Sequence, residues 1–330
     1  MKIDWTKQRV LVTGGAGFLG SHMVEKLQAR GCREVFVFRS KDFDLTREEQ
    51  VSRLFQEHPA DIVIHLAGLV GGIYPNQEWP AQFFYQNLMM GVLTMHYAWK
   101  SGTRKFVCAG AGCGYPEQAP LPLKEEYFWD GFPQRPSYAY SLAKRMLNVQ
   151  SMAYWQQYQF PAIVTIPGTI YGPYDNFDLK NAHVIPALVR KFVEATGTDN
   201  GRGQRVVIWG SGNPTRDFVY AGDVAEGMLQ AADAYDSAQL VNLSSGREHT
   251  VREVVEALTE ITGFEGEVVW DKSKPEGQSR RLFDIGKAKR ELGYEATTSL
   301  YEGLRITAAW YREHRDEARN LVEVASEVKA

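Results

Sequence analysis

Tyr140 and Lys144 lie four positions apart in the stretch YSLAK and carry side chains that can move protons. In a helix this spacing puts both side chains on one face. A tyrosine alone is a poor acid–base catalyst, because its usual pKa is about 10. A neighbouring ammonium group favours the phenolate and brings the group into the range of neutral pH. On spacing alone, a packed tyrosine beside a surface lysine is the better explanation, so the surrounding motifs decide.

A glycine-rich loop, TGGAGFLG, follows the first apolar run and opens a helical pattern. Gly14, Gly17 and Gly20 permit a tight turn, close approach to a pyrophosphate and tight packing of helix on sheet. The N-terminus of the helix adds N–H donors and a dipole that favours an anion. Strand, loop and helix together favour a dinucleotide site over an ordinary glycine-rich turn.

The end of the second predicted strand bears on which dinucleotide binds. An NAD site usually has an acidic residue there, bonded to the ribose hydroxyls. In this chain the strand EVFVF runs into Arg39 and Ser40. A cation and a hydroxyl suit a 2′-phosphate, so NADP is preferred. Asp42 and Asp44 are close enough to keep NAD as an alternative, and a solvated loop charge is the other explanation of Arg39.

Longer stretches resemble one family of enzymes, the GDP-L-fucose synthases of the extended short-chain dehydrogenase/reductases. The resemblance follows the glycine loop and YSLAK and covers nearly the whole chain in order: LVGGIYPN (69–76), CGYP (113–116), SYAYSLAK (137–144), YGPYDNFDLKNAHVIPAL (171–188), VVIWGSGNPTRDFVYAGDVA (206–225) and DKSKPEGQSRRLFDI (271–285). NAHVIPAL and WGSGNPTRDF are much more specific than the glycine loop. The resemblance implies an NADPH-dependent enzyme that epimerises C3 and C5 of GDP-4-keto-6-deoxy-mannose and then reduces C4.

The implied chemistry gives each matched residue a role. A 4-ketone acidifies the protons on both neighbouring carbons, so inversion needs a base on one face and an acid on the other. Cys113 and His183 match the family's residues in these roles, and a thiolate and an imidazole suit them. Tyr140 would protonate or polarise the C4 oxygen. Taken singly, Cys113 is better explained as a small buried hydrophobe and His183 as an exposed residue at a helix start. Within the matched motifs, the functional roles are favoured.

The resemblance also implies the binding residues. The cofactor contacts are Gly14, Gly17, Phe18, Leu19, Gly20, Arg39, Asp44, Leu45, Leu66, Ala67, Gly68, Asn87, Tyr140, Lys144, Pro167 and His183. The substrate contacts are Val184, Leu188, Lys191, Trp209, Arg216 and Lys274. Arg216 suits a diphosphate; its structural alternative is an ion pair with Asp217 or Asp223.

Three positions depart from the family pattern. Ala111 stands where the family has the serine of its Ser–Tyr–Lys set. Losing such a donor to a developing charge can cost on the order of 10²-fold in rate. Thr169 replaces an asparagine near the sugar, and Lys191 replaces an arginine that is common at the diphosphate, which keeps the charge and loses the bidentate fork. The nucleobase preference for guanine is therefore favoured but open.

Several functions compete with the leading one. Ala111 suggests an epimerase without net reduction at C4. A redox-neutral 4-epimerase has no use for a cysteine–histidine pair, and a 4,6-dehydratase needs an acidic pair where this chain has Gly112 and Cys113. A non-catalytic Rossmann protein that senses cofactor or sugar nucleotide is the alternative from another class, but it has no need to keep Tyr140, Lys144, Cys113 and His183 together.

The elements that must position these residues alternate in type. Strands are predicted at 9–13, 34–38, 61–67, 105–110 and 162–166, and helices at 18–31, 46–58 with Thr46 as N-cap, 80–101 and 137–158. This alternation indicates an α/β fold with a Rossmann doubly wound parallel sheet. We expect an NADP-binding domain at 1–176 with returning segments at 217–246, and a smaller α/β domain for the nucleotide sugar at 177–330.

Composition excludes several classes of partner. A net charge of −3 gives no reason to expect nucleic acid or an anionic membrane, and no apolar run approaches the roughly 18 residues of a membrane span. The N-terminal stretch has no secretory pattern, and three cysteines without metal-ligand spacing argue against a disulfide framework and a metal site. We expect a cytoplasmic protein, and the resemblance implies a homodimer through the helices near 80–101 and 138–157.

Overall fold

A six-stranded parallel sheet forms the centre of the computed structural model, which describes residues 2–197, 199–274 and 277–318. Its order is β10-β5-β4-β3-β1-β2. The strands are β1 (Arg9–Thr13), β2 (Glu34–Val37), β3 (Ile62–His65), β4 (Lys105–Ala109), β5 (Ala162–Pro167) and β10 (Gln239–Leu243). Each neighbouring pair is parallel. The predicted Rossmann class is confirmed.

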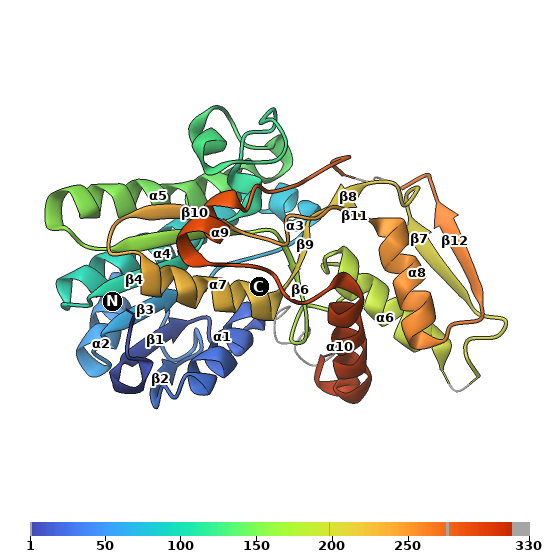
Figure 1. Ribbon diagram of the computed structural model, residues 1–330, viewed down its shortest axis with the longest axis horizontal. Coiled ribbons are helices and arrows are strands. Elements are labelled where there is room, and N and C mark those ends of the chain that lie inside the picture. The colour runs from blue at the N-terminus through green and yellow to red at the C-terminus, as the bar shows by residue number, and fades with distance from the viewer. Residues whose placement is uncertain (1, 198, 275–276, 319–330) are drawn as a thin grey trace.

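Helices cover both faces of this sheet (Figure 1). On one face lie α1 (Phe18–Ala29), α7 (Ala221–Ala234) and α9 (Gly286–Leu292); on the other lie α2 (Glu48–Glu57), α4 (Pro80–Lys100) and α5 (Tyr138–Tyr158). Successive strand residues alternate between the two cores, since Val10 and Val12 pack on the first face and Leu11 on the second. Both faces are therefore buried, as a parallel sheet requires.

Two helix ends differ from the prediction by two residues, and three others by one residue. The predicted N-cap at Thr46 is wrong, because α2 begins at Glu48 with Arg47 as N-cap. The Thr46 hydroxyl instead donates to the Asp44 carboxylate at 2.7 Å, which also accepts the Thr46 N–H at 2.9 Å. A local turn thus uses the hydroxyl that would have capped the helix. Helix α1 ends at Ala29, and Gly31 follows with a left-handed φ of +76°.

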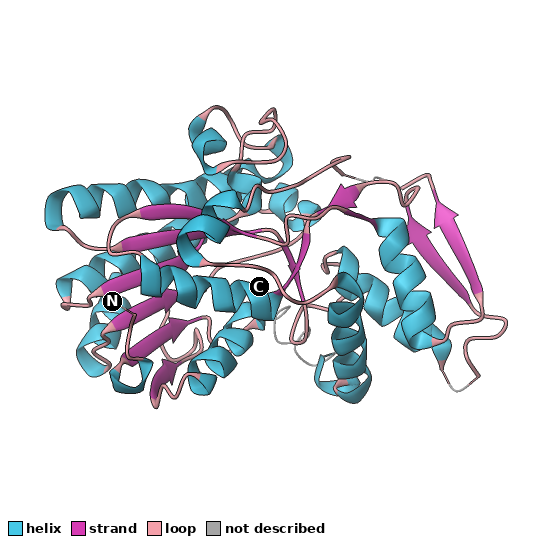
Figure 2. Ribbon diagram, viewed as in Figure 1, coloured by secondary structure: helices cyan, strands magenta, loops and turns pink. Residues whose placement is uncertain are grey.

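A second body is built from shorter elements (Figure 2). Helices α6 (Val184–Thr196), α8 (Val251–Thr262) and α10 (Leu300–Glu313) share an apolar core with β7 (Arg205–Trp209). Three strand pairs complete it: β7 with β12 (Glu267–Asp271), β8 (Thr215–Arg216) with β11 (His249–Thr250), and β6 (Thr169–Tyr171) with β9 (Phe218–Tyr220). A short helix, α3 (Ile73–Glu78), precedes α4.

The proposed domain limits stay a prediction. Helix α7 and strand β10 lie against the central sheet, although they follow β7 and β9 in the chain. Residues 198, 275–276 and 319–330 belong to the predicted second domain and lie outside the described residues. Among the residues that are described, no helix combines the length and apolar character needed to cross a bilayer.

The chain reverses its direction of winding at β1, which lies between β2 and β3. In open parallel sheets, ligands bind outside the carboxyl ends of the strands at such a switch point. The glycine loop follows β1 and the segment 66–68 follows β3, so the fold brings both to this edge. The fold thus places the predicted cofactor loop where the general rule puts a dinucleotide.

Candidate active site

The glycine loop is packed so tightly that side chains are excluded from it. Gly14 has φ +69°, and a Cβ there would lie 2.7 Å from the backbone nitrogen of Ala67. A Cβ on Gly20, in the first turns of α1, would lie 2.0 Å from the Gly14 carbonyl oxygen. Gly17 is the N-cap of α1 and its N–H donates to Gly14 O at 2.9 Å. This close backbone cradle at a helix N-terminus fits a bound pyrophosphate.

Arg39 follows β2 at the same edge. Its side chain is exposed and, within the described residues, makes no hydrogen bond or ion pair. Its backbone N–H binds the Asp42 carboxylate at 3.0 Å, and Asp44 is occupied by Thr46, while Leu45 is buried. The two carboxylates are therefore engaged in local turns and the cation is free. This arrangement suits a 2′-phosphate better than a ribose diol.

Tyr140, Lys144 and Cys113 come together at the carboxyl end of β4. Tyr140 and Lys144 lie in the first turns of α5, with the Lys144 Nζ 6.0 Å from the centre of the Tyr140 ring. The Lys144 ammonium is buried and donates to the carbonyl of Ala109, the last residue of β4, at 3.3 Å. Cys113 lies in the 3₁₀ turn Gly112–Gly114, which follows directly and which we call the cysteine turn. The predicted catalytic residues of this half of the site are thus neighbours.

The charges in this cluster act on one another. Burial raises the pKa of Tyr140 well above its usual value of 10, and the Cys113 thiolate adds to the effect. Burial lowers the pKa of Lys144, and the thiolates of Cys108 and Cys113 oppose that shift. A phenol with a raised pKa keeps its proton at neutral pH. Tyr140 therefore carries a proton that it can donate, and it can accept a proton only after it has lost its own.

Asn87 and Gly68 lie beside Lys144, in contact with the segment that follows β3. The Asn87 amide donates to Leu69 O at 3.0 Å and accepts from Leu69 N at 3.1 Å, which fixes the segment after β3. A Cβ on Gly68 would lie 2.9 Å from Asn87 Oδ1 and 3.3 Å from Lys144 Nζ. Leu66 lies at the start of this segment, and its N–H donates to Thr13 O at 3.0 Å. The chain here therefore runs within contact distance of the catalytic lysine.

Pro167 backs the cysteine turn. It ends β5, is buried, and its carbonyl oxygen would lie 3.3 Å from a Cβ on Gly112. The ring of Phe283 also packs against Gly112, because its Cζ would lie 2.7 Å from that Cβ. Ala111 immediately before the turn is 7% exposed and offers no hydroxyl. The turn is thus held closely, with a methyl group at the position of the family serine.

His183 stands apart from this cluster. It is the N-cap of α6, and the residue as a whole keeps part of its surface exposed, although protein atoms surround its ring. No hydrogen bond or ion pair joins it to Cys113, Tyr140 or Lys144 in the described part of the chain. The protein around it desolvates the ring and lowers its pKa. Its loop lies against the segment after β3, because a Cβ on Gly72 would lie 3.9 Å from Asn181 O.

Two arginines that form no ion pair with a carboxylate in the described part of the chain lie side by side near Cys113. Arg216 is half-buried, and its Nη1 donates to Thr215 O at 2.7 Å. Burial and the adjacent Arg281 lower the pKa of Arg216 to about 10. Burial also lowers the pKa of Arg281, while the Cys113 thiolate opposes this shift. Two half-buried like charges without a carboxylate partner among the described residues suit an anion with more than one negative charge.

The pairing of two segments explains this arrangement. Thr215 N donates to Ser279 O at 2.9 Å and Asp217 N donates to Arg281 O at 3.0 Å, so 215–217 and 279–281 run together. Asp217 does not pair with Arg216: its carboxylate accepts from Ser245 and from the N–H groups of Gly246 and Phe283. Asp223 binds Thr297 and Thr298 instead. The structural alternative for Arg216 is therefore wrong.

The remaining predicted substrate residues fall into two groups. Trp209 ends β7 with 60% of its surface exposed, and the Lys274 ammonium lies 5.7 Å above its ring. Lys191, whose pKa is lowered by burial, donates to Val207 O at 2.7 Å on the same strand. Leu188 is only 4% exposed and packs in the core of the second body, whereas Val184 is half-buried at the start of α6. An exposed indole with a cation beside it fits a stacked base.

Arg281 was missed by the sequence analysis. The basic loop 271–281 led to Lys274, but the structure places Lys274 over Trp209 and Arg281 beside Arg216. The available signal was the doubled arginine, Arg280 and Arg281. Arg280 is exposed and paired with Glu248, which leaves Arg281 as the inward one. Sequence order alone does not tell which of two adjacent arginines faces inward.

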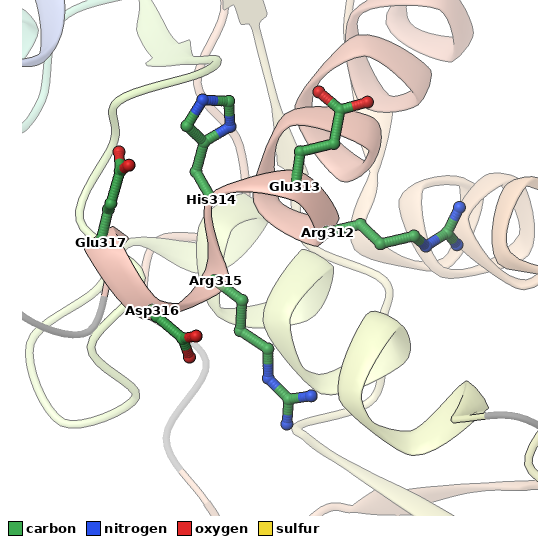
Figure 3. A pocket seen from close by; sticks show the side chains of 6 residues that line it. All are labelled: Arg312, Glu313, His314, Arg315, Asp316 and Glu317. Atoms are coloured by element: carbon green, nitrogen blue, oxygen red, sulfur yellow. The ribbon is translucent and has the colours of Figure 1, made fainter.

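A hollow at the end of α10 is unrelated to this cluster (Figure 3). It is lined by six consecutive residues, Arg312, Glu313, His314, Arg315, Asp316 and Glu317. Their side chains point in different directions from one bend of the chain, and other elements contribute none of the lining. Within the described residues, no three His, Cys, Asp or Glu side chains are grouped as metal ligands.

The family follows from comparison with known proteins. The model of the NAD dependent epimerase/dehydratase family matches residues 10–244. The chain belongs to this family. GDP-L-fucose synthase 1 of Arabidopsis thaliana is 37% identical over 303 residues, which cover 92% of this chain and 93% of that protein. GDP-L-fucose synthase of Escherichia coli K12 is 33% identical, over 95% of this chain and 99% of its own length.

A solved structure agrees with the fold of this epimerase/dehydratase family member. The GDP-L-fucose synthetase of Naegleria fowleri bound to NADP has a TM-score of 0.85 at 26% identity, over 94% of this chain and 95% of that one. The resemblance on which the sequence analysis relied is confirmed, and so is the assignment to an enzyme family. The individual site residues stay predictions.

Proposed function

We propose that this protein is an NADPH-dependent 3,5-epimerase/4-reductase of a GDP-linked 4-keto-6-deoxy sugar, similar to the GDP-L-fucose synthases. The observation that carries the proposal is the grouping of Cys113 with Tyr140 and Lys144, beside two unneutralised arginines. Relatives named GDP-L-fucose synthase, similar over more than nine-tenths of the chain, support it.

Cofactor binding is proposed at the carboxyl ends of β1 and β3. Gly14, Gly17 and Gly20 leave room for the pyrophosphate, with Phe18 and Leu19 in the first turn of α1. Arg39 meets the 2′-phosphate, and this favours NADP over NAD; a similar structure is described as bound to NADP. The segment 66–68, Asn87 and Pro167 border the rest of the dinucleotide. When bound, NADPH supplies the hydride for C4.

The proton chemistry is divided between two groups of residues. Cys113, as thiolate, removes a proton from a carbon next to the ketone, and Lys144, Arg145 and Arg281 supply positive charge around it. His183 delivers a proton to the opposite face, and its lowered pKa makes it a ready donor once protonated. Tyr140 donates its proton to the C4 oxygen, because its raised pKa keeps it protonated at neutral pH.

The substrate's nucleotide is proposed to lie along the second body. Arg216 and Arg281 bind the diphosphate, and Trp209 with Lys274 stacks on the base. Lys191, Val184 and Leu188 belong to α6, which lies beside this path. We accordingly propose residues 1–176 with 217–246 as the NADP-binding part and 177–330 as the nucleotide-sugar part.

We also propose a cytoplasmic homodimer. Helices α4 and α5 pack together on the sheet and keep large apolar side chains exposed to solvent: Phe84, Tyr85, Val149, Met152 and Tyr158. Val149 and Met152 lie one turn apart on α5, so they present a common apolar surface. Such side chains on two parallel packed helices support a helix-bundle contact between two copies.

Ala111 favours a second candidate, an epimerase without net reduction at C4. Its methyl group stands where a hydroxyl would donate to the C4 oxygen, and it is nearly buried. Ala111→Ser restores that donor. If the missing hydroxyl limits reduction, this variant reduces C4 on the order of 10²-fold faster, with deuterium exchange at C3 and C5 unchanged. Equal reduction rates would show that another donor already serves C4.

The product distribution tests the proposed function. The protein is incubated with GDP-4-keto-6-deoxy-mannose in deuterated water, with and without NADPH, and the products are identified by NMR and mass spectrometry. We expect deuterium at both carbons beside the ketone in either case, and a C4-reduced sugar only with NADPH. Exchange without reduction would select the second candidate. The absence of both exchange and reduction would reject both candidates.

A further inference from the structure

Arg145 is a buried cation that neither the cofactor nor the substrate is expected to reach. It follows Lys144 on α5 but is only 3% exposed. No carboxylate in the described residues forms an ion pair with it. Its guanidinium instead lies 5.4 Å from the ring centre of Phe128 and 5.3 Å from that of Trp129. A buried arginine with no counter-ion is costly, so its contacts need a functional or structural explanation.

Those contacts hold the cysteine turn. Arg145 Nε donates to the carbonyl of Gly114, the residue after Cys113, at 2.5 Å. Its Nη1 donates to Gly131 O at 2.8 Å, in the segment 116–137 that we call the strap. The strap lies between β4 and α5 in the chain and projects above α5 at the top of Figure 1. One planar fork therefore ties the catalytic turn and the strap to the helix that carries Tyr140 and Lys144.

The cysteine turn is closely packed and is closed by a backbone hydrogen bond. A Cβ on Gly114 would lie 2.9 Å from the Phe128 ring, whose other neighbours include Tyr115 at a centroid distance of 5.2 Å. Gly114 N donates to Ala111 O at 2.8 Å, which closes the turn around Cys113. The guanidinium thus holds a peptide that already packs against the Phe128 ring.

The Arg145 guanidinium also interacts electrostatically with the Cys113 thiol. The cations that interact electrostatically with Cys113 are Lys144 and Arg145 from α5 and Arg281 at the end of the loop 271–281. No carboxylate is among them. Lys144 faces Tyr140 and Arg281 faces the proposed diphosphate, whereas Arg145 is enclosed. Its remaining nitrogen, Nη2, is buried and has no hydrogen-bond partner among the residues that the structure describes.

We propose that Arg145 is a positioning residue for Cys113: it holds the turn that carries the thiol and keeps a permanent positive charge beside it. The proposal rests on the proposed function, in which Cys113 is the base. Geometry and charge are separable contributions, because a lysine keeps the charge and loses the fork. A base whose thiolate depends on an enclosed arginine remains active while substrate binding occupies Arg281.

The thiolate itself can be measured without substrate. Iodoacetamide alkylates a thiolate, with the sulfur displacing iodide, and Cys113 is the accessible cysteine because Cys32 and Cys108 are buried. We call the alkylation rate measured across a range of pH the alkylation profile. In Arg145→Met, we expect this profile to fall below that of the wild type, with a rate about tenfold lower near pH 7, because the thiol loses a neighbouring positive charge and the contact that holds its turn. Cys113→Ser identifies the background reaction.

Two further variants separate charge from geometry and from general loosening. Arg145→Lys should keep the wild-type alkylation profile but lose about tenfold in deuterium exchange at the carbons flanking the ketone, because the thiol is misplaced. Asn148→Ala, one turn along α5, removes the acceptor of Trp129 Nε1 at 3.0 Å and loosens the same strap without touching the charge. It should leave the alkylation profile unchanged.

The outcomes distinguish this proposal from the function on which it rests. A wild-type alkylation profile in Arg145→Met, or an equal fall in Asn148→Ala, overturns the role of Arg145. If Arg145→Met does not fold, the Arg145→Lys variant provides the test, and full exchange activity in that variant also overturns the role of Arg145. Absence of exchange in the wild-type protein, together with the expected fall in alkylation, rejects the proposed function and supports the electrostatic role.

Discussion

A single exposed side chain decides the cofactor preference. Arg39 has no partner among the described residues, while the nearby acids Asp42 and Asp44 accept local hydrogen bonds. Arg39→Ala should raise KM for NADPH by about 10- to 100-fold, which is the worth of a hydrogen bond between charged groups, and change KM for NADH little. Steady-state kinetics with both cofactors measures this.

Arg47→Ala is the matched control for that prediction. Arg47 is an exposed cation in the same loop, but it already pairs with Glu49 at 2.7 Å. Its removal changes the net charge equally and should leave the two KM values near wild type. An equal loss with NADPH and NADH in Arg39→Ala would remove the case for a 2′-phosphate contact.

At the scale of single residues, the sequence led to most of the candidate site residues but did not reveal what surrounds them in the fold. The YSLAK spacing and the family resemblance led to Tyr140, Lys144 and Cys113, which the fold brings together. Arg281 and Arg145 were missed because their importance depends on having no carboxylate nearby. That property arises from long-range packing, which one sequence does not display.

At the scale of elements, the loop between β1 and α1 depends on the absence of a side chain at Gly20. A Cβ there would meet the Gly14 carbonyl oxygen at 2.0 Å and Gly15 Cα at 2.6 Å, and backbone atoms cannot rotate away. Gly20→Ala should therefore cost about 1–3 kcal/mol of unfolding free energy and weaken NADPH binding. Thermal unfolding and fluorescence titration with NADPH measure the two effects.

Gly17→Ala is the comparison for this helix start. Its Cβ would meet the nearest atom, Gly14 O, at 3.2 Å, a tight contact that a small shift relieves. We expect a clearly smaller loss of stability than in Gly20→Ala. A Gly20→Ala protein that unfolds at the wild-type temperature would contradict the packing described for the loop.

The predicted elements show what hydrophobic periodicity can determine. Parallel strands, crossover helices and their order followed from the alternation of apolar runs, because each pattern records a buried face. The cap at Thr46 failed because Asp44 competes for the threonine hydroxyl. The short pairs β6–β9 and β8–β11 join residues distant in sequence, so local patterns do not reveal them.

The whole molecule is predicted to work as a pair. If α4 and α5 form the contact, the protein should run at twice its chain mass of 37.3 kDa in size-exclusion chromatography with light scattering. Met152→Glu places a charge in that apolar surface and should yield monomers. Leu179→Glu, at another exposed apolar residue outside these helices, is the control.

Monomeric behaviour of the wild-type protein would refute the dimer. Mass unchanged by Met152→Glu would instead place the contact elsewhere. The family resemblance implied this dimer, but the patterns of the two helices alone do not require it, because packing on the sheet satisfies them. The apolar side chains left exposed after folding add support for a partner copy.

The central claim is that Cys113 removes the proton beside the ketone. Its most direct test is deuterium incorporation into GDP-4-keto-6-deoxy-mannose in deuterated water by wild type, Cys113→Ser and the buried control Cys32→Ser, with NADPH binding measured in parallel. We predict that Cys113→Ser loses at least about 100-fold in exchange while binding NADPH normally, and that Cys32→Ser exchanges like wild type. Undiminished exchange in Cys113→Ser would contradict the account.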